Sequence, residues 1–201
     1  MGISPKAFAK MSERLSSGET RSPASGPANQ SMGSGPVRIL GIDPSLRGTG
    51  FGLITARGQK MEYLDSGTIV CPRTWPHSRC LLKIFEGLSD AIQAHSPEVC
   101  VIEGLFFAKN SKTALVMGQA RGACMVAASR AGLPIYEIAA RKVKQAIVGF
   151  GGAQKIAVAK MVERMLELKE TPSPDAGDAL ALAMTFTLES RSRIAKPIER
   201  I

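Results

Sequence analysis

Apolar residues along the chain fall into short runs bounded by glycine, proline and polar turns. The run VRILGID stops before a proline and indicates a buried strand. Two further runs, TGFGLIT and MEYLDSGTIV, flank the polar turn ARGQK and predict a meander of three strands. The run VCVIEG is too short for a helix and rich in Val and Ile, which indicates a strand, and LPIYEI is a further expected strand. The pattern predicts five strands, at residues 37–43, 49–55, 61–70, 99–104 and 133–138.

Helical periodicity fills the rest of the chain. Between residues 77 and 95, large apolar side chains recur every three or four positions, which predicts an amphipathic helix. Further helices are predicted over residues 113–131, 139–148, 154–169 and 175–192. This order of strands and helices predicts an α/β domain with a five-stranded mixed sheet flanked by helices.

The two ends of the chain differ from its middle. Residues 1–36 are rich in Gly, Pro and Ser and hold few large apolar side chains, so they cannot offset the entropy of ordering. We therefore predict a disordered N-terminal tail at 1–36, a folded domain at 37–192 and a basic C-terminal tail at 193–201. A weak nonspecific DNA-binding arm is the alternative role for the N-terminal segment.

Charge narrows the choice of partner. The chain has 26 Lys and Arg against 17 Asp and Glu, a formal net charge of +9 at pH 7. This balance favours a polyanion, with nucleic acid first and an anionic membrane surface second. No apolar stretch suits a membrane span or a signal peptide, so we expect a soluble cytoplasmic protein. The four cysteines lack zinc-site spacing and are expected to be reduced core residues.

Acidic residues end two apolar strands of this basic protein. Asp43 ends the first predicted strand and Glu103 the fourth. If these strands are parallel neighbours, both carboxylates project from one edge of the sheet, where α/β proteins place their ligands. Asp175 and Asp178 fall in the first turn of the last predicted helix and share one face. Taken singly, each of the four acids could be a turn, strand-end or helix-capping residue.

Four acids that converge at one edge are better explained by a metal site. Divalent cations would relieve their repulsion, and all-oxygen ligands suit Mg²⁺ or Mn²⁺ rather than zinc. Two such ions support phosphodiester hydrolysis, because one activates water and the other stabilises the leaving 3′ oxygen. Together with the positive charge, this chemistry predicts a nuclease.

Five sequence blocks resemble, in the same order, the RuvC family of Holliday junction resolvases. They are ILGIDPSLRGTGFGL, IEGLFFAKN, LVMGQARGA, AARKVKQAIVGFGGAQK and PDAGDALALA, and they span nearly all of residues 37–190. The resemblance implies an RNase H-like fold and a homodimer. It also implies a structure-specific endonuclease that resolves four-way DNA junctions in recombination and repair by symmetric, Mg²⁺-dependent nicking of two strands. The branch-migration proteins RuvA and RuvB are the implied partners.

The family's catalytic residues carry over by position. Its acidic ligands, which would hold two ions per active site, correspond to Asp43, Glu103, Asp175 and Asp178, the set reached above from polarity and spacing. Two family lysines with roles in DNA binding or cleavage correspond to Lys144 and Lys155. An ammonium there would balance charge at the scissile phosphate or hold the DNA backbone, whereas the alternative is a solvated helix face. We expect Lys144 to affect mainly the cleavage rate and Lys155 mainly binding.

A loop after Glu103 is implied to face the DNA. Phe106 corresponds to a family aromatic that inserts at or stacks on junction bases, and stacking tolerates any base sequence. The pattern leaves open whether Phe106 or its neighbour Phe107 faces DNA. Lys109 and Asn110 are expected in the same loop.

Some positions depart from the family pattern or allow two interpretations. Ser45 stands where the family usually has Gly, and Arg47 alters the charge of the same loop; neither change removes a ligand. Gly118 and Gly122 lie one helical turn apart in a region that resembles the family's dimer-forming helix. They serve either contact between two subunits or tight packing on the parent sheet.

Two other functions compete with the resolvase. A junction-binding protein without cleavage is disfavoured because all four acids are present. An ATP-binding module of the actin and sugar kinase group is suggested by GIDPSLRGTG, which also resembles the first phosphate loop of that group. That group needs a second domain and a second phosphate loop, for which about 165 folded residues leave little room.

Overall fold

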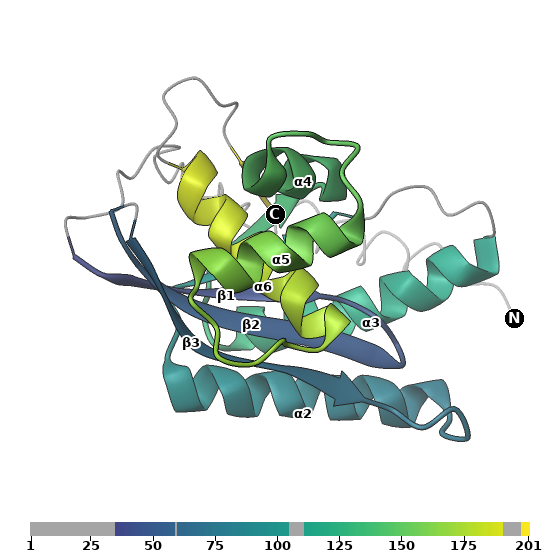
Figure 1. Cartoon of the computed structure of the whole chain (residues 1–201). Helices are drawn as coiled ribbons and strands as arrows, with labels where there is room; N and C mark the ends of the chain where they lie inside the picture. The colour runs from purple at the N-terminus through teal and green to yellow at the C-terminus, as the bar shows by residue number, and fades with distance from the viewer. Residues whose placement is uncertain (1–34, 59, 105–110, 191–197) are drawn as a thin grey trace, which may run out of the picture. The chain divides into compact units, whose positions relative to one another are not determined.

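A mixed sheet is the frame of the fold. The computed structural model (Figure 1) describes residues 35–58, 60–104, 111–190 and 198–201. Its sheet has six strands in the order β3-β2-β1-β4-β5-β6. The strands are β1 (Val37–Asp43), β2 (Gly48–Arg57), β3 (Lys60–Val70), β4 (Val99–Glu103), β5 (Ile135–Ile138) and β6 (Glu199–Arg200). The first three form an antiparallel meander, β1, β4 and β5 run parallel, and β6 is antiparallel to β5. The predicted mixed sheet is confirmed.

The sheet has one strand more than the sequence pattern predicts. In β6, Arg200 pairs with Tyr136 and Glu199 with Glu137. This strand lies within residues 193–201, which the composition assigns to a C-terminal tail. Two residues are too few to show the alternation that marks a strand, so the pattern carries no signal for β6. The expectation of five strands was wrong for this reason.

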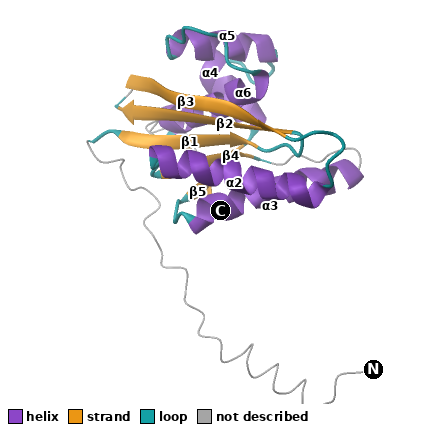
Figure 2. Cartoon of the chain, turned by 90° about the horizontal axis from the view of Figure 1, so that it is seen from below, coloured by secondary structure: helices purple, strands orange, loops and turns teal. Residues whose placement is uncertain are grey.

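Helices cover both faces of the sheet. On one face lie α2 (His77–His95) and α3 (Ser111–Arg130), and on the other lie α4 (Ala140–Val148), α5 (Lys155–Met165) and α6 (Pro174–Glu189) (Figure 2). Helix α5 ends at Met165 rather than at the predicted residue 169, because Leu166 leaves the helical conformation and Glu167 has a φ of 50°. Among the described residues, no helix combines the length and apolar character that crossing a membrane requires.

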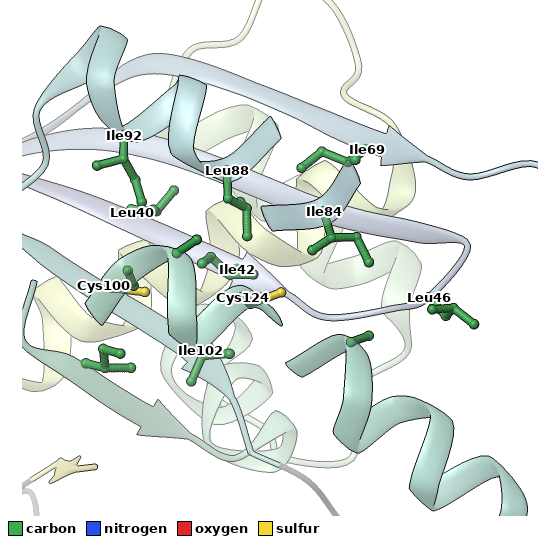
Figure 3. Packing of buried hydrophobic residues seen from close by; sticks show 14 of the residues in the cluster. Leu40, Ile42, Leu46, Ile69, Ile84, Leu88, Ile92, Cys100, Ile102 and Cys124 are labelled. Atoms are coloured by element: carbon green, nitrogen blue, oxygen red, sulfur yellow. The ribbon is translucent and has the colours of Figure 1, made fainter. Parts of the chain in front are cut away.

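Each face of the sheet has its own apolar core. Side chains alternate along β1, so that Ile39 joins the core beneath α6 while Leu40 and Ile42 join the core beneath α2 and α3 (Figure 3). Full burial of such a side chain contributes about 1.5–3 kcal/mol. The core beneath α2 and α3 also buries the four unpaired cysteines, which are Cys71, Cys80, Cys100 and Cys124. The prediction of core cysteines without disulfides is confirmed.

Two strand glycines allow α6 to lie directly against the sheet. A Cβ added at Gly41 would come within 2.0 Å of the Ala179 carbonyl oxygen, and one at Gly50 within 2.0 Å of the Asp175 carbonyl oxygen. Any side chain at these positions would push the helix away from the sheet. The close contact therefore brings the first turns of α6, with their aspartates, to the edge where β1 ends.

Candidate active site

Three acidic side chains from separate elements line one small cavity. Asp43 ends β1, Glu103 ends β4, and Asp178 lies in the second turn of α6. The first two are neighbours because β1 and β4 are parallel, with Ile42 paired to Ile102. The cavity has a volume of about 60 Å³, and a site of that size has room for a few water molecules or ions. The structure thus brings together three of the four predicted acids.

Negative charge is concentrated in this partly buried place. Burial is the largest cause that raises the pKa of Asp43, to about 8, and the charge of Glu103 and a hydrogen bond between the two side chains act in the same direction. At neutral pH, Asp43 therefore keeps a proton that it shares with Glu103. A cation that binds there must displace this proton, as metal ligands do in general.

Two lysines face the same cavity. Lys155, the first residue of α5, donates from Nζ to Oδ2 of Asp178 at 2.7 Å, and this hydrogen bond raises the pKa of Lys155. Lys144 reaches the cavity from α4. Because the Lys155 side chain is 80% exposed, it is open to an incoming phosphate while it contacts an acid of the site. The two lysines lie at the cavity and not on a remote helix face.

Asp175 lies outside the residues that line this cavity. It is in the first turn of α6, which the Ser173 hydroxyl caps by accepting a hydrogen bond from the Ala176 backbone N–H at 3.4 Å. Its Oδ2 atom is 2.8 Å from the position that a Cβ at Gly48 would occupy, at the start of β2. The shared helix face predicted for the two aspartates therefore does not bring both into one cavity. Asp178 lies in the cavity with Asp43 and Glu103, and Asp175 does not line it.

The donor set fits a divalent cation. Within the described part of the chain, no three Asp, Glu, His or Cys side chains already stand at ligand spacing. The hydrogen bond between Asp43 and Glu103 and the ion pair between Lys155 and Asp178 satisfy the acids instead. The carboxylate oxygens are nonetheless hard donors that share one cavity, and their burial without a cation is unfavourable. Mg²⁺ and Mn²⁺ match such donors.

The Arg47 side chain forms hydrogen bonds within the fold and does not project into solvent as a free charge. Its Nη1 donates to the carbonyl oxygens of Pro72 at 2.5 Å and Trp75 at 3.2 Å. These bonds join the loop after Asp43 to the loop before α2. The departure from the family pattern at Arg47 is therefore a structural contact between two loops at this edge of the sheet.

The sequence pattern missed one contact at the site and one exposed aromatic side chain between α4 and α5. Arg121 of α3 is buried and donates to the backbone carbonyl of Glu103, but an Ala-rich helix gives no signal that its arginine points inward. Phe150, in the turn between α4 and α5, is 67% exposed, and this exposure is visible only in the structure. The loop expected to face DNA lies outside the described residues, with Phe106, Phe107, Lys109 and Asn110.

The outer face of α3 is open. A Cβ at Gly118 or at Gly122 would meet no atom within 4 Å, so tight packing on the parent sheet does not explain these glycines. Leu115 and Val126, on the same face of the helix, are 69% and 58% exposed. Of the two interpretations of the glycines, contact with another subunit is the one compatible with this geometry.

Comparisons of sequence agree on one family. A family model described as crossover junction endodeoxyribonuclease RuvC matches residues 39–186. The crossover junction endodeoxyribonuclease RuvC of Citrifermentans bemidjiense is 47% identical over 146 residues, which is 73% of this chain and 89% of that protein. The protein of the same name from Pasteurella multocida is 50% identical over 147 residues, 73% of this chain and 77% of that protein.

Comparisons of structure agree with this result. RuvC of Thermus thermophilus, solved in complex with Holliday junction substrate, is 32% identical with a TM-score of 0.76, and the match covers 82% of this chain and 99% of that one. The yeast mitochondrial Holliday junction resolvase Ydc2, 11% identical over 75% of this chain and 78% of that one, has a TM-score of 0.55 and is similar in fold alone. The expected RNase H-like fold is confirmed. The chain belongs to the RuvC family of crossover junction endodeoxyribonucleases.

Proposed function

We propose that the chain is a structure-specific endonuclease that resolves Holliday junctions, nicking two strands symmetrically in DNA recombination and repair. The cavity in which Asp43, Glu103 and Asp178 meet Lys144 and Lys155 is the observation that carries this proposal. Acids that share a partly buried cavity repel one another, so a protein that only bound the junction would gain nothing from keeping them. These five residues, together with Asp175 from the first turn of α6, are the proposed catalytic residues.

We propose Mg²⁺ as the cofactor, with Mn²⁺ as a substitute and two ions per active site. The residues that would hold it are Asp43, Glu103 and Asp178, together with Asp175 from the first turn of α6. Such ions supply an activated water and stabilise the leaving 3′ oxygen. Before Asp43 can act as a ligand, it must give up the proton that it shares with Glu103.

The lysines are proposed to hold the DNA phosphate at the cavity. Lys155 has an exposed ammonium that already lies beside Asp178, so a phosphate that contacts Lys155 is also close to the acids. An ammonium in this place balances the negative charge that develops on the phosphate oxygens during cleavage. The proposal that Phe106, Lys109 and Asn110 contact the DNA rests on the IEGLFFAKN sequence block.

We propose that the protein acts as a homodimer through the outer face of α3. Gly118 and Gly122 leave space for a second helix, and Leu115 and Val126 supply apolar surface on the same face. A twofold dimer presents two equivalent active sites, as the two symmetric nicks require. We also propose that RuvA and RuvB act with it on the junction, in the cytoplasm.

The test is cleavage of a synthetic four-way junction with Mg²⁺ and with EDTA, beside a linear duplex of the same length. We expect paired nicks in the junction when Mg²⁺ is present, none with EDTA, and no cut in the duplex. Tight junction binding without nicks, with Mg²⁺ and with Mn²⁺, would contradict the proposal and identify a junction-binding protein without cleavage. ATP hydrolysis without nicking would favour the ATP-binding module.

A further inference from the structure

Arg121 of α3 carries a buried charge next to a proposed metal ligand. Among the described residues it is the one charged residue that is buried, with 8% of its surface exposed. Its guanidinium donates from Nη1 to the backbone carbonyl of Glu103 and from Nη2 to the carboxylate of Glu137. We infer that Arg121 is a positioning residue for the cleavage site and acts through Glu103. This inference rests on the proposed function, in which Glu103 holds the metal.

Glu103 needs a second point of attachment because it is the last residue of β4. It pairs with Ile138 of β5, and the Gly104 N–H donates to the Ile138 carbonyl at 3.0 Å as the strand ends. Backbone groups at a strand end fray unless they are bound. The guanidinium of Arg121 supplies a partner for the Glu103 carbonyl. The peptide that carries the Glu103 side chain is thereby held between a helix and the sheet.

Glu137 fixes the arginine in turn. It lies on β5, where it pairs with Ile102, the residue before Glu103 in β4. Its carboxylate neutralises the guanidinium, whose burial without a partner would be unfavourable. An added Cβ at Gly104 would lie 3.0 Å from Oε1 of Glu137, so the missing side chain leaves room for this carboxylate. Arg121, Glu137 and the end of β4 form one connected unit.

An arginine suits this role better than a lysine. Its planar fork reaches two acceptors at once in a fixed geometry, whereas a lysine ammonium sits on a flexible stem. Substitution of a residue that orients a metal ligand through hydrogen bonds typically lowers metal affinity by roughly 10- to 100-fold. Lys155 is exposed and can reach a DNA phosphate, whereas Arg121 is buried and cannot. Loss of the Arg121 side chain should therefore weaken metal binding and leave DNA affinity unchanged.

The variants separate positioning from stability. Arg121→Met alone leaves the Glu137 charge without its partner and should lower Tm. Arg121→Met combined with Glu137→Gln removes both charges and should restore Tm, because neither charge is then left without its partner. Arg121→Lys keeps the charge but loses the fork. Arg130→Met is the matched control, because Arg130 is in the last turn of the same helix and lies over the Phe85 ring.

Mn²⁺ binding without DNA is measured by calorimetry on the full chain, beside Tm and junction affinity in EDTA. We expect the double variant to bind Mn²⁺ about tenfold or more weakly than wild type, with Tm and junction affinity unchanged. Its cleavage rate should approach that of wild type as Mn²⁺ is raised. Arg130→Met should match wild type throughout.

Wild-type Mn²⁺ affinity in the double variant would overturn the inference. If the double variant does not fold, wild-type Mn²⁺ affinity in Arg121→Lys would overturn it in the same way. Failure of the proposed function gives a different result, since wild type itself would then bind no Mn²⁺, or Asp43→Asn would bind it as wild type does. That result would overturn the inference together with the proposed function on which it rests.

Discussion

Helices α6 and α3 both contain runs of small residues, but the two helices place them against different partners. Every residue of α6 from 179 to 187 is buried, because strand glycines such as Gly41 admit the helix backbone to the sheet. In α3, Gly118 and Gly122 face open space on the side away from the core. One helix uses its small residues within the fold, and the other leaves them free at the surface.

The difference shows what a small residue in a helix indicates. It permits another backbone to come close, but the helix alone does not identify that backbone. For α6 the complementary glycines lie in β1 and β2, so the backbone that comes close is that of the sheet. This contact places Asp178 at the cavity. For α3 the described chain offers no such partner on its outer face, which favours a second subunit. Substitutions at a strand glycine, on α3, and at the acids and lysines of the cavity test this contrast.

Gly41→Ala should have the largest effect. Its new methyl group would lie 2.0 Å from the Ala179 carbonyl oxygen, so α6 must shift, at a cost of about 1–3 kcal/mol or more in unfolding free energy. Cleavage should fall as well, because Asp178 moves with the helix. Gly122→Ala is the matched control. Its methyl group meets no atom of the same chain within 4 Å, so in dilute monomer the variant should stabilise α3 by about 0.5–1 kcal/mol. Equal stability of the two variants in urea unfolding would contradict the contrast.

A charge on the outer face of α3 should separate subunits and leave the fold intact. Val126 is 58% exposed, so Val126→Glu should not change the free energy of unfolding of the isolated chain. It should weaken dimerisation by about 2 kcal/mol, the size of an interface hot spot, which is roughly thirtyfold in dissociation constant. Sedimentation over a range of concentrations measures this. A wild-type dimer in Val126→Glu would place the interface elsewhere.

The acids beneath α6 should make stability depend on pH in the absence of metal. The pKa of Asp43 is raised to about 8 in the folded protein, whereas an unfolded Asp titrates near 4. The folded state therefore holds the proton more tightly, and the stability that this contributes is lost as pH rises from about 4 through 8. Asp43→Asn removes this loss. In EDTA, its Tm should exceed that of wild type by a margin that grows over this window to several °C. A pH-independent difference would show that Asp43 is not buried with a second acid.

The smallest effects are expected from substitution of the two cavity lysines, Lys144 and Lys155, which should differ in the step that they affect. Lys155→Ala should flatten the dependence of log affinity on log salt by about one unit, the value for one lost phosphate contact. Lys144→Ala should instead lower single-turnover cleavage at saturating junction. Arg57→Ala is the control, since Arg57 is an exposed cation at the opposite end of β2 from this edge. Wild-type behaviour of both lysine variants in both assays would show that Lys144 and Lys155 are ordinary residues of a solvated helix face.

Much of the fold followed from local sequence patterns. The strands that end at Asp43 and Glu103 are apolar runs, and the sequence predicted that the two acids are neighbours if these strands pair in parallel. The structure meets that condition. Helix α2 has the predicted bounds because its apolar positions repeat cleanly. Strand β6 is too short to leave a pattern, and the end of α5 depends on the positive φ of Glu167 rather than on periodicity.

Three of the four predicted acids, and the two lysines implied by the family resemblance, lie at the candidate cavity, but their arrangement did not follow from the sequence. Helical spacing places Asp175 and Asp178 on one face, but which of them lies at the cavity depends on where strand glycines let α6 touch the sheet. Arg121 is a tertiary contact, and its burial is visible only once α3 is placed against β4 and β5. Residues that touch through space leave no periodic trace in the chain.

Single-turnover nicking of a four-way junction by wild type and Asp43→Asn in Mg²⁺ tests whether this cavity is the active site. Asp90→Asn serves as the control, because it removes an exposed acid from α2. We expect Asp43→Asn to leave the junction uncut while binding it as tightly as wild type in EDTA, since the basic surface supplies most of the affinity. Asp90→Asn should cleave normally. Near-normal nicking by Asp43→Asn would contradict the assignment of this cavity as the active site.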